Sequence, residues 1–182
     1  MNKRMLLPAL ALLALLAANL HPCCRVRIDG EWDGALYPPA QLRRGLRAAA
    51  AAAAEILPGE ETLPELEARL VFSLRPPEGN SRRLSALLLS RTEGVASLCA
   101  VEAGGERFGL TEDREKTEER LRAALYRTMP AGATRAFFAE GIEFRPLYGR
   151  EGSALAPGDI ALAVSGAVPA VYTDGEGHRI SG

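Results

Sequence analysis

The sequence has few of the side chains on which metal binding and general-base catalysis usually depend. Its 182 residues include only two histidines, His21 and His178, near opposite ends of the chain. Zinc sites need several histidine or cysteine ligands at short spacings, and the sequence contains no such spacing. Phosphate loops and dinucleotide-binding glycine motifs are lacking as well. We therefore predict no metal site and no cofactor.

Lysine is also scarce, because the 22 basic residues include only Lys3 and Lys116 and the rest are arginines. The formal net charge is −1 and the sequence pI is ≈ 6.2. No basic block is interleaved with aromatic residues, as a face that follows nucleic-acid phosphates requires. The composition predicts that nucleic acid is not a partner.

Nucleophilic catalysis has no recognisable motif in this chain. The serines are scattered, none lies in a G-x-S-x-G elbow, and residues 25–166 contain no histidine that can act as a base. Glu140 and Glu143 lie near a predicted strand, so a buried acid is an open alternative there. We predict a protein that is not an enzyme, and we keep a small cell-wall hydrolase as an alternative.

The three cysteines, two of them adjacent, do not make a disulfide framework. Cys99 lies in a predicted strand, where we expect a small buried apolar residue. Two alternatives stay open, namely a bridge from Cys23 or Cys24 to Cys99 and attachment of a lipid to Cys23 or Cys24.

The long apolar run of the chain is at its N-terminus. Lys3 and Arg4 precede residues 5–20, which are almost entirely apolar. A basic region followed by an apolar run of this length is typical of a secretory signal, and the run is short for a membrane span. Its end has no clear cleavage site. We predict that residues 1–24 are a signal peptide or a signal anchor, with membrane anchoring through residues 5–20 in the second case.

The rest of the chain is organised around residues 100–127. A short strand leads to the turn Gly104-Gly105, and a return strand then leads into a helix. The same pattern starts at Val26, and a third start appears at Val171. The sequence predicts an α+β fold, with a duplicated β-hairpin–helix–strand–short-helix unit and helices packed on an antiparallel or mixed sheet. The predicted parts are 25–94 (first unit), 95–166 (second unit) and 167–182 (a C-terminal hairpin, the incomplete third unit).

Local features place further elements. Pro38-Pro39 marks the start of a long helix, because a fixed φ and a missing N–H cost little there. Its apolar stripe consists of Leu42, Leu46, Ala49, Ala53, Ile56 and Leu57. Asn80 or Ser81 is expected to cap a short helix. In the second unit we predict a strand within the stretch 136–146, with Ile142 and Phe144 alternating and Arg145-Pro146 at its end, and a short helix over residues 157–164.

The return strand of the first hairpin carries Trp32, the only tryptophan. An indole on a strand either packs in a core or stacks on a sugar, so we treat Trp32 as a candidate ligand contact. The two return strands also share a glycine, Gly34 in the first and Gly109 in the second. We expect both glycines to serve tight hairpin exits.

The stretch AGGERFGLTEDREKTEERL, with its Arg-Glu-x-x-Glu-x-x-Leu helix, resembles the non-catalytic N-terminal segment of secreted, LysM-containing peptidoglycan endopeptidases (lysostaphin-type) of Firmicutes. The stretch EGIEFRPLYGREGSALAPGDIALAVSG resembles the segment that precedes a LysM module there, so the resemblance covers about residues 25–170. It implies an extracytoplasmic, cell-envelope setting. The peptidase activity and the LysM glycan binding are carried over to no residue, because the zinc-binding set is missing and the LysM-like start at residues 171–180 ends at Gly182.

Together these features predict a secreted or membrane-anchored protein of a Gram-positive envelope that acts as a non-catalytic structural or binding module. The expected partner is the cell wall or another envelope protein. The alternative is a membrane-tethered regulatory or interaction ectodomain.

Overall fold

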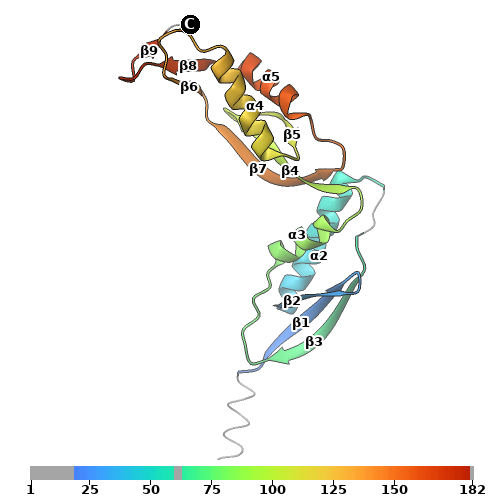
Figure 1. Ribbon diagram of the computed structural model, residues 1–182. Helices are drawn as coiled ribbons and strands as arrows, with labels where there is room; N and C mark the ends of the chain where they lie inside the picture. The colour runs from blue at the N-terminus through green and yellow to red at the C-terminus, as the bar shows by residue number, and fades with distance from the viewer. Residues whose placement is uncertain (1–18, 60–62, 181–182) are drawn as a thin grey trace, which may run out of the picture. The chain divides into compact units, whose positions relative to one another are not determined.

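The computed structural model describes residues 19–59 and 63–180. The chain divides into two compact units, the first ending at Val95 and the second beginning at Ala96. The described residues form four helices and three small antiparallel sheets of three strands each (Figure 1). The predicted α+β class is confirmed. Most of the predicted signal segment, residues 1–18, falls outside the described part of the chain.

The first unit is a sheet of strand order β2-β1-β3 packed against two helices. Its elements are β1 (His21–Ile28), β2 (Glu31–Tyr37), α2 (Pro39–Ile56), β3 (Leu66–Ser73) and α3 (Ser81–Ser90). Alternation along β1 sends Val26 and Ile28 into the core, where both are fully or almost fully buried. Asp29 and Gly30 adopt φ values of 48° and 84°, which confirms the predicted turn.

The two helices of the first unit lie close together because α2 presents small residues to α3. A Cβ added at Gly45 would lie 3.0 Å from the Leu84 side chain, so this position leaves little room for any other residue. Pro39 begins α2, as predicted. The side chain of Asn80 accepts a hydrogen bond of 2.9 Å from the Arg83 amide, which confirms the predicted cap of α3.

The second unit contains a sheet of order β5-β4-β7 and a smaller sheet of order β6-β8-β9. Its strands and helices are β4 (Val95–Ala103), β5 (Glu106–Thr111), α4 (Arg114–Arg127), β6 (Arg135–Phe138), β7 (Ile142–Arg150), α5 (Pro157–Ala167), β8 (Ala170–Thr173) and β9 (Arg179–Ile180). Val101 of β4, Leu121 of α4 and Ile160 of α5 meet in its core. The hairpin predicted near the C-terminus is present as β8 and β9, and it pairs with β6 inside this unit.

Both units run strand, strand, helix, strand, helix if β6, β8 and β9 are set aside, and in both the first strand is central in its sheet. This order agrees with a repeat, but it does not establish that one unit arose by duplication of the other, which stays a prediction.

Two sequence-based boundaries need correction. Residues 21–24, which the sequence assigned to the N-terminal signal segment, belong to β1, and Cys23 and Cys24 are buried there. The strand predicted around Ile142 and Phe144 is present as β7, but Pro146 lies inside it rather than ending it, and β6 precedes it as a separate short strand. The reason is that β7 is an edge strand, where a residue without an N–H need not interrupt the ladder.

Candidate binding face around Trp32

Trp32 lies on β2 directly opposite Arg27 of β1. Its side chain is 44% exposed, so the ring is available at the surface rather than packed in the core. Between this pair and the pair Arg25–Leu36, β2 carries two more residues than β1 does, which is an irregularity of the bulge type. Because Trp32 pairs with Arg27, which alternates along β1 with the buried Val26 and Ile28, the indole lies on the face of the sheet opposite to the core.

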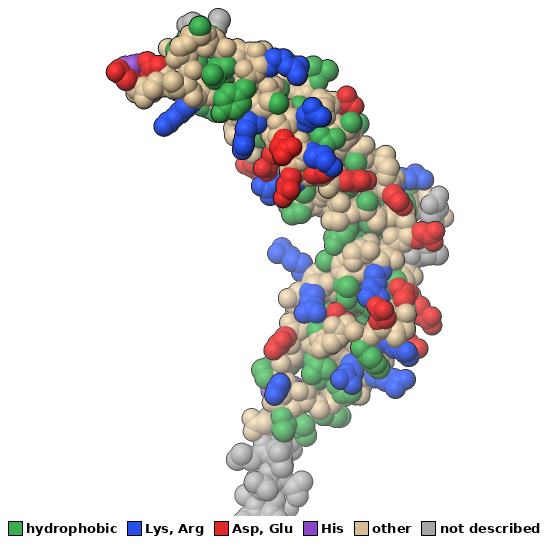
Figure 2. All heavy atoms as spheres, in the orientation of Figure 1, with side chains coloured by type: hydrophobic (Ala, Val, Ile, Leu, Met, Phe, Trp, Pro, Cys, Tyr) green, Lys and Arg blue, Asp and Glu red, His purple; other side chains and the backbone are tan. Residues whose placement is uncertain are grey.

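Three guanidinium groups surround the indole. The guanidinium carbon of Arg25 lies 5.3 Å from the ring centroid, that of Arg69 lies 5.8 Å from it, and that of Arg27 lies 5.9 Å from it. These distances are within the range of cation–π contacts. Arg25 and Arg69 face each other across the β1–β3 pair. We call Trp32 with these three arginines the Trp32 face. In the first unit, basic side chains lie beside hydrophobic ones on the visible surface (Figure 2).

The Trp32 face carries an excess of positive charge. Arg27 lies 3.8 Å from Glu67, and both side chains are substantially exposed, so this ion pair contributes little. No other described carboxylate lies within ion-pair distance of Arg25 or Arg69. Three guanidinium groups therefore share one carboxylate. Because a cation–π contact leaves the outer N–H groups of a guanidinium free to donate, the face can accept an anionic ligand.

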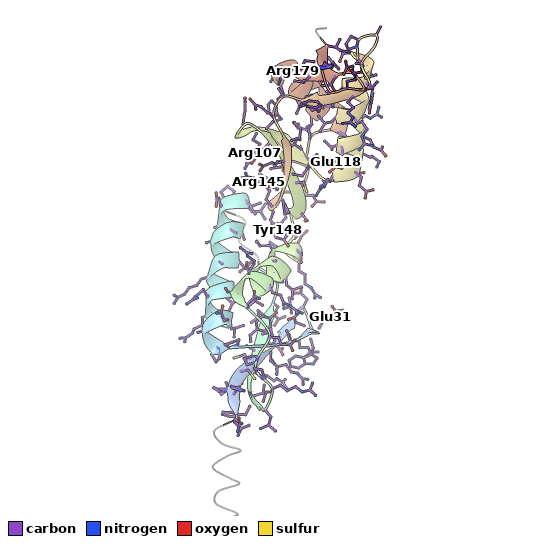
Figure 3. The ribbon with its side chains drawn as sticks, turned by 90° about the vertical axis from the view of Figure 1, so that its left-hand side faces the viewer. Glu31, Arg107, Glu118, Arg145, Tyr148 and Arg179 are labelled. Atoms are coloured by element: carbon purple, nitrogen blue, oxygen red, sulfur yellow. The ribbon has the colours of Figure 1, made fainter. Side chains whose placement is uncertain are left out.

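The second unit offers an internal comparison. In its larger sheet, Glu102 of β4 lies 3.2 Å from Arg107 and 3.1 Å from Arg145. Figure 3 labels these two arginines. Glu143 lies 2.7 Å from Arg145, and this contact, followed by the charge of Glu102, raises the pKa of Arg145. Two arginines thus meet two carboxylates, and the face is balanced. The excess charge of the Trp32 face is not a general feature of these sheets.

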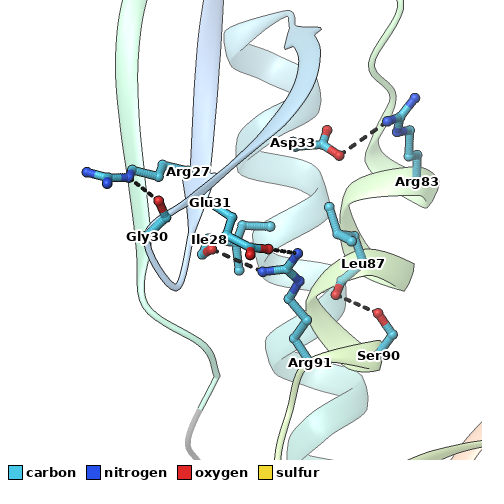
Figure 4. Close-up of polar contacts among 9 residues, drawn as sticks. All are labelled: Arg27, Ile28, Gly30, Glu31, Asp33, Arg83, Leu87, Ser90 and Arg91. Atoms are coloured by element: carbon cyan, nitrogen blue, oxygen red, sulfur yellow. Dashed lines mark hydrogen bonds and ion pairs between the residues drawn. The ribbon is translucent and has the colours of Figure 1, made fainter.

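Contacts to α3 hold the hairpin that carries Trp32. Arg91 donates a hydrogen bond of 3.1 Å to the Ile28 carbonyl and forms an ion pair of 2.9 Å with Glu31 (Figure 4). Arg83 reaches Oδ1 of Asp33 at 3.2 Å (Figure 4). The turn and the middle of β2 are therefore both tied to one helix, which fixes the strand that presents the indole.

A groove of about 440 Å³ lies between α4 and the β6–β7 segment, in the second unit. Its apolar lining includes the exposed aromatic residues Tyr126 and Phe137. Arg114 at its rim lies 5.1 Å from the Phe144 ring centroid and 2.6 Å from Glu118. The charged groups of this groove are therefore partly engaged with each other, and it offers no clear preference for a charged ligand.

The residues considered for catalysis are not brought together as a buried site. Glu140 and Glu143 are both exposed, so the alternative of a buried acid near this strand is wrong. Glu140 lines the groove, whereas Glu143 is engaged by Arg145. Within residues 19–59 and 63–180, no group of three or more His, Cys, Asp and Glu residues can hold a metal ion.

All three cysteines are free. Cys23 is fully buried and Cys24 is 7% exposed, and burial, followed by the neighbouring Cys23, raises the pKa of the Cys24 thiol. Cys99 is half-buried in β4. The alternative of a bridge to Cys99 is thus wrong, and a lipid on either neighbouring cysteine would have to displace core packing.

The sequence identified Trp32 but missed the three arginines. Arg25 and Arg27 had a detectable signal, because the alternation Arg-Val-Arg-Ile places both on one face of a strand. Arg69 had none, because its position depends on the pairing of β3 with β1 across more than forty residues. A single aromatic residue was therefore visible as a candidate, whereas its charged surroundings required the fold.

Comparison of the chain with models of protein families, with curated proteins and with solved structures found no match. In the described part of the chain, no helix has both the length and the apolar character needed to cross a membrane.

Proposed function

We propose that this protein is a non-catalytic binding module of a Gram-positive cell envelope that contacts the cell wall through the Trp32 face. The observation that carries the proposal is the exposed indole with three guanidinium groups and one carboxylate around it. The apolar run at residues 5–20, which is typical of a secretory signal, and the resemblance to envelope peptidases support the same location.

The ligand chemistry follows from the groups on this face. Guanidinium forks match carboxylates and phosphates, which they bind through paired hydrogen bonds. An exposed indole edge adds apolar contact with a sugar ring. An anionic polymer that contains sugars satisfies both, and a bacterial wall offers this chemistry as peptide carboxylates and as phosphodiester polymers.

The proposal is tested by co-sedimentation of the full-length protein, kept in mild detergent, with purified Gram-positive sacculi at low and high salt. We expect pelleting with sacculi, weakening at high salt, and a marked loss for Trp32→Ala. Tyr126→Ala is the matched control, because it removes an exposed aromatic residue of the second unit. Pelleting is also measured with sacculi from which acid has removed the phosphodiester polymers. Pelleting that persists assigns the bound anions to peptide carboxylates, and pelleting that is lost assigns them to the phosphodiester polymers. Absence of pelleting at either salt concentration would contradict the proposal.

A further inference from the structure

Strand β3 forms one edge of the first sheet and exposes large apolar side chains. Leu70 is 62% exposed, Phe72 is 64% exposed, and Leu74, directly after the strand, is 59% exposed. In the described residues, β3 pairs with β1 on one side and with no strand on the other. An exposed apolar edge strand is a site at which another strand can pair.

Two other edge strands, β2 and β7, have features that hinder such pairing, and β3 lacks them. The β2 edge contains a bulge and the left-handed Gly34, with φ of 79°. The β7 edge contains Pro146, which cannot donate to a further strand. In contrast, β3 contains no proline, and its pairing with β1 is regular along its whole length. Of these three edges, the edge of β3 is therefore the one suited to strand addition.

We propose that β3 pairs antiparallel with β3 of a second copy of this chain, about a twofold axis through Val71. The two three-stranded sheets then form one continuous sheet. In this register, Leu70 lies opposite Phe72 of the second copy, and Ala68 lies opposite its Leu74, so the apolar side chains cover each other. Because the axis is symmetric, each contact occurs twice.

Charge complementarity selects this register. Glu67 lies opposite Arg75 of the second copy, and both belong to the same face because they are an even number of residues apart. A twofold axis through Leu70 would instead place Glu67 opposite Ser73. An axis through Ala68 would place Phe72 opposite Pro64, which cannot donate to a ladder.

The pairing requires Leu74 and Arg75 to extend β3 beyond Ser73. At present the Arg75 amide donates a hydrogen bond of 3.0 Å to the Ser73 hydroxyl, in an exposed bend. This bend is held by one exposed hydrogen bond to a side chain. Backbone hydrogen bonds between the two β3 strands and burial of Leu74 against the second copy can compensate for the loss of that bond.

Directly opposed residues of an antiparallel pair share a face, so the two Trp32 faces of the dimer lie on the same side of the joined sheet. Two weak sites on one rigid sheet then bind a long polymer with higher apparent affinity than either site does alone. The dimer itself does not depend on the proposed wall ligand.

The register is tested by charge exchange in the full-length protein in detergent, with mass measured by analytical ultracentrifugation. We expect a dimer for the wild type. Glu67→Arg and Arg75→Glu each place like charges opposite one another at two positions and raise the dimer dissociation constant about tenfold. The double variant Glu67→Arg/Arg75→Glu restores the dimer, and Phe72→Lys weakens it. Glu106→Arg, at the exposed start of β5 in the second unit, is the control for net charge.

A monomer at all concentrations would overturn the proposal and leave the β3 edge to a different protein or to residues 1–18. A dimer whose dissociation constant is unchanged in Glu67→Arg, Arg75→Glu and Phe72→Lys would also overturn it, since association would then occur elsewhere. Trp32→Ala leaves the dimer intact in this account, so failure of dimerisation and failure of wall binding are separate results.

Discussion

Tyr37 and Asp33 are joined by a hydrogen bond beneath the hairpin that presents Trp32. The Tyr37 hydroxyl donates to Oδ2 of Asp33, while Arg83 holds Oδ1 of the same carboxylate at 3.2 Å. Tyr37 is fully buried, and the Asp33 side chain is 7% exposed. A buried carboxylate is tolerated because both of its oxygens have partners. Through Arg83, the bulged strand β2 is tied to α3.

Removal of the Tyr37 hydroxyl is expected to destabilise the first unit. Tyr37→Phe leaves one oxygen of a buried carboxylate without its partner, which costs about 1–3 kcal/mol in the free energy of unfolding. Urea denaturation followed by circular dichroism measures the change. Tyr126→Phe, which alters an exposed tyrosine, is expected to have little effect. Equal stability of the two variants would show that the buried bond contributes nothing.

The same pair predicts loss of stability at alkaline pH. Burial, with the adjacent Asp33 as a further cause, raises the pKa of Tyr37 above its ordinary value. Since the folded pKa exceeds the unfolded one, the contribution is complete below about pH 10 and is lost as the pH rises toward the folded value. The free energy of unfolding of the wild type should therefore fall more steeply above about pH 10 than that of Tyr37→Phe. Parallel curves would contradict this prediction.

Gly79 lies directly against the ring of the buried Tyr37. A Cβ added at Gly79 would overlap the ring atoms Cδ1, Cε1 and Cγ. Gly79→Ala is expected to destabilise the protein by about 1–3 kcal/mol, because the buried ring cannot move aside without strain. Gly158→Ala is the matched control, since a Cβ there meets nothing within 4 Å and the residue lies in α5. It should be neutral or stabilising. Thermal unfolding of both variants measures the contrast.

The first turn of α4 predicts a dependence of stability on acidic pH. The Asp113 carboxylate accepts a hydrogen bond of 3.0 Å from the Lys116 amide and lies 2.7 Å from Lys116 Nζ. The Lys116 side chain, followed by this amide, lowers the pKa of Asp113. A lowered folded pKa stabilises the fold above the unfolded value, and the effect disappears as the pH falls through the folded value. The difference in stability between the wild type and Asp113→Asn should therefore shrink below about pH 4. Glu119→Gln is the control.

The start of β1 limits where the N-terminal segment can be removed. Since His21 pairs with Ser73 and Cys23 is fully buried, a chain that begins after Cys24 would lack half of the central strand. N-terminal sequencing of the native protein should therefore find a start no later than His21. A start near Leu20 would rule out a tether, and an intact N-terminus would support one. A start at Arg25 or later would contradict this account of the first unit.

Local sequence signals predicted the elements of the fold well where the cause is local. The Asp29-Gly30 turn, Pro39 at the start of α2 and the Asn80 cap of α3 each depend on backbone preferences of one or two residues. The stripe of α2 was also predicted, except that Gly45, which lies against Leu84, was missed.

Features that depend on distant neighbours could not be predicted in this way. Gly34 and Gly109 look equivalent in the sequence, but they are glycines for different reasons. Gly34 has a φ of 79°, whereas at Gly109 the side chains of Leu155 and Ile160 leave no room for a Cβ. The positive charge around Trp32 depends partly on Arg69, which lies on a different strand, β3. The sequence therefore indicated where an aromatic contact lies but not which ligand chemistry its surroundings favour.

The central claim is that unbalanced arginines around Trp32 bind an anionic wall polymer. The direct test compares the affinity for sacculi of Arg25→Gln/Arg69→Gln with that of Arg107→Gln/Arg145→Gln, in which the same charge is removed from the balanced face. We expect the first variant to bind at least about tenfold more weakly than the wild type, because charge-assisted hydrogen bonds to the ligand are lost. The second variant should bind as the wild type does. Equal affinities for the two variants would contradict the claim.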